Sequence, residues 1–318
     1  MRNEEISPRF WSGTGPFQLD ATIFHATIAG GVHAHCKAFI ATWKRFADCW
    51  APKRSLGKYK DFQRMWRELR QTETMPVQAF AFTDEDSFLL EVNSVGVTMT
   101  PGGWPVQEFL GAHLPVALAR LEHWRKGKLL LATGEYVQHL DTATVEKLVA
   151  YVSEGGCLYM RADAGRHCLE QPNEDWVLLR RLGFTPPERE LEKDRYRQAT
   201  TPKGQEFRLR DGWQVDSVGE SLATFKHNSA PALSRLPFGK GTVIVRWSQT
   251  AMPPPHGGGH SILGDVADLA GVRRHARADH PRLWTNLLKH RRRPVWYALV
   301  YAGPWYNPIN ENPVTGRT

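Results

Sequence analysis

The stretch "DTATVEKLVAYVSEGGCLYM" (141–160) decides which fold this sequence favours. Asp141 or Thr142 can cap a helix, and apolar side chains then recur at helical spacing. Two glycines, Gly155 and Gly156, end that helix and turn the chain into a short apolar strand. The side chains expected on the buried face of the helix are Val145, Leu148, Val149 and Val152.

A second apolar run, "KLLLAT" (128–133), precedes the helix and is typical of a strand. Strand, capped helix and strand in this order favour a parallel pair, because parallel strands need a crossover long enough to hold a helix. "VQAFAF" (77–82) and "FGKGTVIVRW" (238–247) supply further strands. The sequence therefore predicts an α/β fold with a mostly parallel sheet flanked by helices, over roughly residues 75–275.

The other segments are less regular. Residues 170–236 are polar and interrupted by proline, with short strand candidates such as "EFRLR" (206–210), and "MPPPHGGGH" (252–260) is typical of a mobile loop. "RLWTNLLKHRRRPVWYALVYAGPW" (282–305) predicts two strands joined by a basic turn, which is a C-terminal β-hairpin. Before residue 75 we expect a helix and a short strand, an aromatic loop, and an amphipathic helix over 59–71.

Composition limits the class of protein. The chain has 318 residues, of which 41% are hydrophobic and 23% charged, so it is globular, with two domains or one domain and flanking pieces. The net charge of +8 is dispersed, and the densest run, "KHRRRP" (289–294), reads as a solvated turn, so we expect no nucleic-acid partner. Neither an apolar run of roughly 18 residues nor a signal-peptide pattern is found, so we expect no membrane partner. A cytoplasmic location is expected, with export as the alternative if a signal precedes Met1. Four cysteines without CxxC spacing are expected as free thiols: Cys36, Cys49, Cys157 and Cys168.

Two adjacent carboxylates near the start, Glu4 and Glu5, precede an aromatic loop. Glycoside hydrolysis uses a pair of carboxylates, one of them as nucleophile in retaining enzymes, and the loop would offer a stacking surface to a sugar ring. The alternative is a pair of solvated glutamates.

Metal and cysteine chemistry are disfavoured. His25, His33, His35 and Cys36 lack the paired spacing of a structural zinc site, and "HGGGH" (256–260) has no accompanying thiol or carboxylate cluster, so we expect neither metal nor cofactor. The position for a nucleophile elbow, after "KLLLAT", holds no Cys or Ser. Cys157 begins a strand, so we expect it to be buried and inert, and amidotransferase chemistry to be absent.

The order of these features resembles a known family. "LARLEHWRKGKLLLATGEYVQHLDTATVEKLVAYVSEGGCLYMRADAG" (118–165) is similar to the middle domain of family 42 β-galactosidases, often called the trimerisation domain, which has a class I glutamine-amidotransferase-like α/β fold. "EEISPRFWSGTGPFQLDATIFHATIAGGVHAHCKAF" (4–39) resembles the last part of that family's (β/α)8 barrel. The resemblance implies a barrel remnant over 1–74, the amidotransferase-like domain over 75–275, and the start of a C-terminal β-domain over 276–318.

The resemblance also implies a function. One of Glu4 and Glu5 matches the nucleophile, and Phe10, Trp11 and Trp43 are the expected substrate-binding aromatics. With the second catalytic carboxylate not identified, the chain is expected to be the C-terminal part of a β-galactosidase-like hydrolase. It would act as an accessory and oligomerisation module that is inactive alone and forms a homo-oligomer. The alternatives are a hydrolase that acts on carbohydrate when assembled with a missing barrel chain, and a non-catalytic α/β protein that binds a sugar or another ligand.

Overall fold

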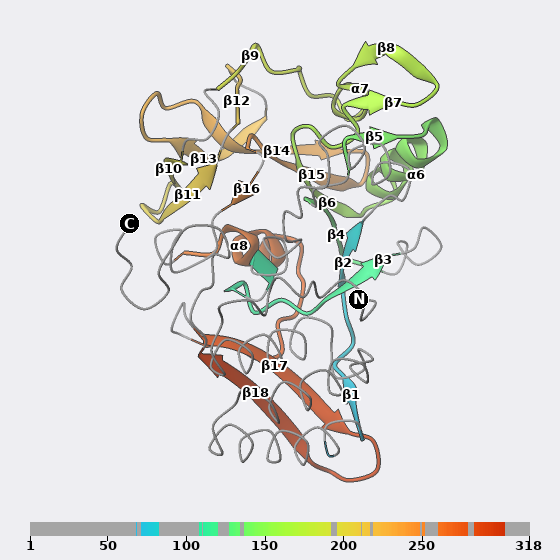
Figure 1. The fold of residues 1–318 in the computed structure, drawn as a ribbon, viewed down its shortest axis with the longest axis vertical. Coiled ribbons are helices and arrows are strands. Elements are labelled where there is room, and N and C mark those ends of the chain that lie inside the picture. The colour runs from blue at the N-terminus through green and yellow to red at the C-terminus, as the bar shows by residue number, and fades with distance from the viewer. Residues whose placement is uncertain are drawn as a thin grey trace, which may run out of the picture. The chain divides into compact units, whose positions relative to one another are not determined.

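The structure is a computed structural model, and it describes residues 68, 71–82, 108–109, 111–119, 127–133, 137–191, 196–210, 212–216, 219–248, 250–251, 260–278 and 283–302. Figure 1 shows the elements with their labels. The three helices with described bounds are α6 (Thr142–Ser153), α7 (Val177–Arg181) and α8 (Ile262–Leu269). The first eight strands are β1 (Thr72–Thr74), β2 (Ala79–Phe82), β3 (Val116–Ala119), β4 (Leu129–Ala132), β5 (His139–Leu140), β6 (Cys157–Arg161), β7 (His167–Cys168) and β8 (Gln171–Asp175). The others are β9 (Arg189–Glu190), β10 (Tyr196–Thr200), β11 (Glu206–Arg210), β12 (Trp213–Gln214), β13 (Glu220–Phe225), β14 (Pro231–Phe238), β15 (Gly241–Arg246), β16 (Thr250–Ala251), β17 (Leu283–His290) and β18 (Trp296–Ala302).

The chain divides into two compact units. One consists of residues 77–274, and the other combines residues 1–76 with residues 275–318.

A ten-stranded sheet organises the unit of residues 77–274, with the order β16-β11-β10-β13-β14-β15-β6-β4-β2-β3. From β3 to β15 the neighbouring strands are parallel, and from β15 to β16 they are antiparallel. The expectation of an α/β fold is confirmed. The prediction of a mostly parallel sheet was wrong for the half of the sheet from β15 to β16, where the strands pair antiparallel, so the sheet is mixed. The reason is loop length: β10 to β11 and β14 to β15 are joined by short turns, which reverse the chain and leave antiparallel pairing as the available arrangement.

Helix α6 forms as the sequence predicts. The Asp141 side chain accepts a hydrogen bond from the backbone N–H of Thr144 at 2.5 Å, which makes Asp141 the N-cap. Val145, Leu148 and Val152 are buried, whereas Val149 is only partly buried. After the helix, Gly155 adopts a φ of 118°, a conformation that residues with a side chain rarely adopt.

Two apolar layers cover the two faces of the sheet. Helices α6 and α7 pack with Leu130, Ala132 and other strand residues on one face. Helix α8 packs with Leu129 and Leu131 on the other face. Because side chains alternate along a strand, the run "LLLA" of β4 can be buried on both sides at once. Figure 1 shows α6 and α8 in separate positions along this sheet.

Two small sheets sit within the same unit. Strands β5, β7 and β8 form one, and β9 pairs with β12 in the other. In the first sheet, His139 of β5 is the register partner of His167 of β7. The two imidazole rings stack with their centroids 5.0 Å apart.

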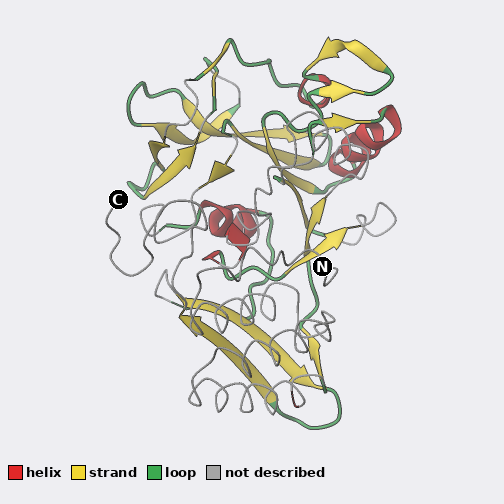
Figure 2. Cartoon of the chain, in the orientation of Figure 1, coloured by secondary structure: helices red, strands yellow, loops and turns green. Residues whose placement is uncertain are grey.

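The second unit contains an antiparallel sheet of β1, β17 and β18, drawn in yellow in Figure 2. Strands β17 and β18 pair from Leu283 with Ala302 to Lys289 with Trp296. The basic residues between them form the turn, so the predicted C-terminal hairpin is present, with β1 as an additional strand.

Candidate ligand pocket

The residues that the sequence suggests for catalysis, sugar binding or metal binding near the start of the chain lie outside the described residues. This holds for Glu4 and Glu5, for Phe10, Trp11 and Trp43, and for His25, His33, His35 and Cys36. The turn after β4, over 134–136, lies outside them as well. The candidate site in the described residues is instead a cavity that sequence reasoning did not find.

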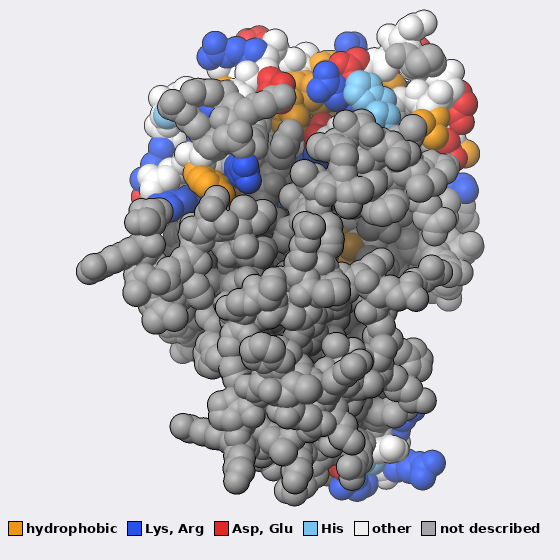
Figure 3. All heavy atoms as spheres, viewed as in Figure 1, with side chains coloured by type: hydrophobic (Ala, Val, Ile, Leu, Met, Phe, Trp, Pro, Cys, Tyr) orange, Lys and Arg blue, Asp and Glu red, His pale blue; other side chains and the backbone are white. Residues whose placement is uncertain are grey.

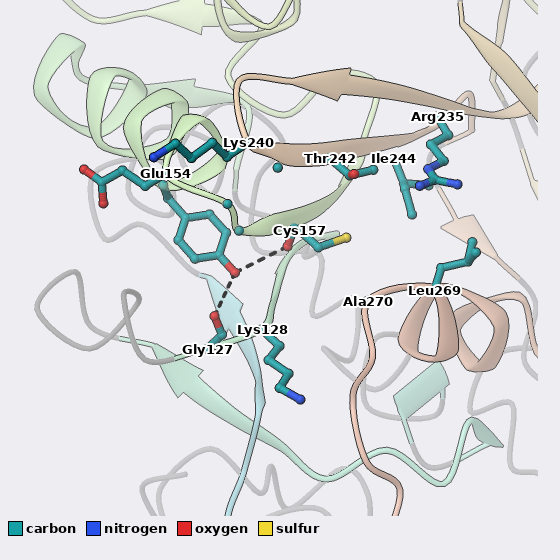
Figure 4. A pocket seen from close by; sticks show the side chains of 14 residues that line it. Gly127, Lys128, Glu154, Cys157, Arg235, Lys240, Thr242, Ile244, Leu269 and Ala270 are labelled. Atoms are coloured by element: carbon teal, nitrogen blue, oxygen red, sulfur yellow. Dashed lines mark hydrogen bonds between the residues drawn. The ribbon is translucent and has the colours of Figure 1, made fainter.

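A pocket of about 430 Å³ opens where the parallel strands begin. Lys128 precedes β4, Cys157 begins β6, and Gly241 begins β15. Figure 4 shows Lys240 and Glu154 at one end of the pocket and Arg235 and Leu269 at the other. The lining residues are Gly127, Lys128, Tyr151, Glu154, Gly155, Gly156, Cys157, Arg235, Lys240, Gly241, Thr242, Ile244, Leu269 and Ala270.

Glycines shape the wall between α6 and the β14–β15 turn. A β-carbon at Gly241 would lie 2.2 Å from the carbonyl oxygens of Gly156 and Val152, so the two backbones approach as closely as they do because residue 241 lacks one. A β-carbon at Gly156 would lie 2.4 Å from the ring of Tyr151. The expected Gly155-Gly156 turn thus also forms one side of the pocket.

Tyr151 joins the helix to the strand ends. Its hydroxyl donates to the carbonyl oxygen of Gly127 at 3.2 Å and lies 3.5 Å from that of Cys157. Burial raises the pKa of Tyr151 well above its ordinary value, and the neighbouring Cys157 adds to the shift. The phenol therefore stays protonated at neutral pH and serves as a hydrogen-bond donor.

Cys157 is buried and free, as the sequence predicts, with 8% of its surface exposed. Burial raises the pKa of its thiol to about 12, and the positive charge of Arg235 opposes that shift. Because the thiolate is the nucleophilic form, the thiol at the pocket wall is unreactive at neutral pH.

Three cationic side chains face this region: Lys128, Arg235 and Lys240. The Lys128 ammonium donates to the carbonyl oxygen of Gly271 at 3.0 Å, just past the end of α8. The Arg235 guanidinium lies 3.5 Å from the Glu220 carboxylate. Helix α6 and helix α8 both end at this pocket, and cations near helix C-termini offset the negative end of the helix dipole.

The arrangement suits binding more than catalysis. Among the lining residues, Glu154 supplies the one carboxylate, and both the thiol of Cys157 and the phenol of Tyr151 are protonated. Ligand pockets have volumes of about 300–1,000 Å³, so this one can hold a small polar molecule against the apolar side chains of Leu269 and Ile244.

Buried ion pairs occupy the opposite, carboxyl ends of the same strands. At the end of β6, Arg161 donates two hydrogen bonds of 2.5 Å to the Asp163 carboxylate, which also accepts from Gln138 at 2.9 Å. At the end of β15, Arg246 donates to both oxygens of Glu108, at 3.2 and 3.1 Å. Burial raises the pKa of Glu108, and the charge of Arg246 opposes it. A sequence signal was present in "CLYMRAD" (157–163), where charges follow a buried strand at once.

The described residues contain no cluster of three or more His, Cys, Asp or Glu side chains that could hold a metal ion. His260, the second histidine of "HGGGH", lies with its Nε2 atom 2.6 Å from the Asp265 carboxylate. The sequence had suggested that no carboxylate cluster accompanies this motif, and the structure adds this single carboxylate.

Comparisons with known proteins show which solved structures have a similar fold. No family model matches the sequence, and no curated protein matches it either. Among solved structures, the chain is similar to Gan42B, a GH42 β-galactosidase from G. stearothermophilus, at 14% identity and a TM-score of 0.53, over 77% of this chain and 37% of that one. The β-galactosidase of Bacillus circulans sp. alkalophilus gives 12% identity and a TM-score of 0.55, over 77% and 39%. That of Halorubrum lacusprofundi gives 14% and 0.55, over 76% and 38%.

These likenesses show the fold. The chain has an α/β fold similar to part of the GH42 β-galactosidases, and it spans 37–39% of the length of these three structures. Among the described helices, none combines the length and the apolar character that crossing a bilayer requires.

Proposed function

We propose that this chain is the C-terminal portion of a β-galactosidase-like glycoside hydrolase and acts as an accessory and oligomerisation module that is inactive alone. The observation that carries the proposal is the likeness to GH42 β-galactosidases, which extends over 77% of this chain in two of the three comparisons. The resemblance of residues 118–165 to that family's middle domain supports it independently, because it rests on sequence pattern alone.

In this proposal each segment of the chain corresponds to a domain, or part of a domain, of the larger enzyme. Residues 75–275 correspond to the amidotransferase-like domain, residues 1–74 to the end of the catalytic barrel, and residues 276–318 to the start of a β-domain. Glu4 or Glu5 would be the nucleophile, with Phe10, Trp11 and Trp43 beside the sugar. The parallel strands with crossover helix α6 support the middle assignment.

The activity test uses the full chain and a nitrophenyl β-galactoside. We expect no turnover above the uncatalysed rate, because no general acid is assigned in this chain and such assistance is worth about 10²–10⁴-fold. Turnover by the full chain that is lost in Glu4→Gln or Glu5→Gln, and kept in the control Glu174→Gln, would contradict the proposal that the chain is inactive on its own. An active hydrolase assembled with a separate barrel chain requires instead that turnover begin when that chain is added.

The oligomerisation role is tested by sedimentation of the same preparation. We expect a defined homo-oligomer, since the proposed module provides subunit contacts in a larger enzyme. A monomer at micromolar concentration would remove this part of the proposal.

A second candidate, a non-catalytic α/β ligand-binding protein, is favoured by the pocket with its protonated thiol and phenol. Its test is the change in melting temperature with galactose. Leu269, which is 51% exposed at the pocket, allows the variant Leu269→Trp to narrow the cavity without disturbing the core. The matched control is Leu169→Trp at another exposed leucine. If galactose stabilises the chain and Leu269→Trp alone abolishes the effect, this candidate is supported; if galactose has no effect, galactose binding is excluded.

A further inference from the structure

The turn between β17 and β18 presents basic and aromatic side chains together. The hairpin tip is defined as six exposed residues of this turn and of the adjoining strand ends: Lys289, Arg291, Arg292, Arg293, Val295 and Trp296. Trp296 is 51% exposed, although large aromatic side chains are mostly buried in soluble proteins. Figure 3 shows basic side chains at the bottom of the view, where this turn lies in Figure 1.

Hydrogen bonds from backbone N–H groups of the turn to His290 and Gln71 hold the hairpin tip in place. The Nδ1 atom of buried His290 accepts hydrogen bonds from the backbone N–H groups of Arg292 and Arg293, at 3.0 and 3.1 Å. The N–H of Arg291 donates to the carbonyl oxygen of Gln71 at 2.9 Å. A surface that is already ordered loses less conformational entropy when a partner binds, which favours recognition by this turn.

The charges of the hairpin tip are only partly compensated. Arg293 pairs with Glu68, and Glu73 is the cross-strand partner of Lys289. Within the described part of the chain, Arg291 and Arg292 make no ion pair through their side chains. The Lys289 ammonium lies 5.9 Å from the centre of the Trp296 ring, so a cation borders the exposed aromatic ring.

We propose that the hairpin tip binds an anionic polysaccharide, one that carries uronate or sulfate groups. The apolar C–H face of a sugar ring can lie on the Trp296 indole, while its acidic group accepts hydrogen bonds from the guanidinium groups of Arg291 and Arg292. Guanidinium groups suit this task, because their planar donor pairs match the oxygens of carboxylates and sulfates. The choice of a carbohydrate rests on the proposed function as part of a glycoside hydrolase.

The size of the hairpin tip favours this partner over a nucleic acid. Proteins that bind duplex DNA tightly commonly contact about six to ten phosphates. The hairpin tip offers one exposed indole and a few cations, which is enough for one or two charged sugar units but short for a nucleic-acid strand.

The experiment measures binding of the full chain to polygalacturonate and to heparin at low salt, with neutral galactan and single-stranded DNA for comparison. We expect binding to at least one anionic polysaccharide that weakens as salt increases, and weaker binding to galactan and DNA. Trp296→Ala should weaken it roughly tenfold, in line with the loss of one stacking contact. The double variant Arg291→Gln/Arg292→Gln should weaken it at least as much and make it less sensitive to salt.

Matched controls lie in the other unit. Tyr196 is 47% exposed with the Arg210 guanidinium 5.8 Å from its ring, so Tyr196→Ala removes a similar aromatic–cation pair. Lys203→Gln/Arg208→Gln removes the same charge from another exposed surface. Equal loss in these controls, failure to bind either anionic polysaccharide, or tighter binding to DNA than to both would overturn the proposal. Activity and sedimentation test the proposed function separately, so the two can fail independently.

Discussion

At the scale of single residues, Cys157 gives the simplest chemical test. Burial raises the pKa of its thiol to about 12, so at pH 8 the thiolate should be about three orders of magnitude scarcer than for an exposed cysteine. In the variant Cys36→Ser/Cys49→Ser/Cys168→Ser, where Cys157 is the one remaining thiol, we expect slow labelling by a maleimide in the native state and rapid labelling in denaturant. Equal rates in the two states would show that Cys157 is accessible.

A second residue-scale prediction concerns the buried pair of Arg161 and Asp163, whose side chains are 7% and 2% exposed. Asp163→Asn removes the charged carboxylate that accepts two hydrogen bonds from Arg161, and removal of one partner of a buried pair costs about 3–5 kcal/mol of unfolding free energy. The control is Asp175→Asn in the partly exposed pair of Arg166 and Asp175, whose side chains are 33% and 43% exposed and which should cost about 1 kcal/mol or less. Unfolding in denaturant measures the loss of unfolding free energy in both variants. Equal losses would show that burial does not strengthen the dependence of Arg161 on Asp163.

At the scale of secondary-structure elements, the pairing of β5 with β7 should depend on pH. Burial lowers the pKa of His167, and nearby His139 and Arg166 lower it further, whereas Asp175 and Asp163 oppose the shift. Because its pKa is lower in the folded state, the unfolded chain takes up the proton more readily. The contribution of His167 to stability is therefore complete above about pH 6.5 and is lost as the pH falls through the folded-state pKa.

Hydrogen exchange can measure this effect at the hydrogen bonds that join the two strands. The N–H groups of His167 and Leu169 donate to the carbonyl oxygens of Gln138 and Leu140, both at 3.0 Å. We expect both amides to lose protection between pH 7 and pH 5, after correction for intrinsic rates. In His167→Gln this loss should be smaller, and an identical loss in that variant would assign it to other groups.

Elements with a strong local signal could be predicted from sequence. Helix α6 has a cap at Asp141, an apolar stripe and a terminal glycine, and each of these acts within a few residues of the chain. Strand β11 was predicted as "EFRLR" (206–210) and is confirmed, with burial on alternate residues. Its neighbours β10 and β13 were harder, since short polar strands carry little apolar signal. The pocket was not predictable, because Lys128, Cys157 and Arg235 meet there through sheet pairing between distant segments.

At the scale of the whole molecule, we predict that the chain self-associates or aggregates through the first 75 residues more than through the α/β core. If they are the end of a barrel, their helices carry apolar faces without a covering layer, and exposed apolar patches of this kind mark interfaces. The side chains expected on these faces are Phe17, Ile23, Phe24, Ile28, Phe62, Trp66 and Leu69. They lie outside the described residues, so the expectation rests on the sequence.

Light scattering on the full chain and on a shortened chain of residues 75–275 provides the measurement. The shortened chain keeps the unit of residues 77–274 whole, so it should melt cooperatively and associate less than the full chain. A stable full-length monomer together with an unfolded shortened chain would show that the first 75 residues belong to the same folding unit.

The pairing of strand β15 has a consequence for how the chain folds while it is being synthesised. The strand is parallel to β6 on one side and antiparallel to β14 on the other. On the ribosome, β6 is synthesised roughly 80 residues before β15, which at about 5–20 residues per second leaves one edge of β6 without its final neighbour for about 4–16 s. The β14–β15 hairpin can close as soon as it emerges, because its ends are close in sequence. The nascent chain therefore carries an open, apolar strand edge for several seconds, during which a chaperone that covers such an edge would protect it from pairing with another chain.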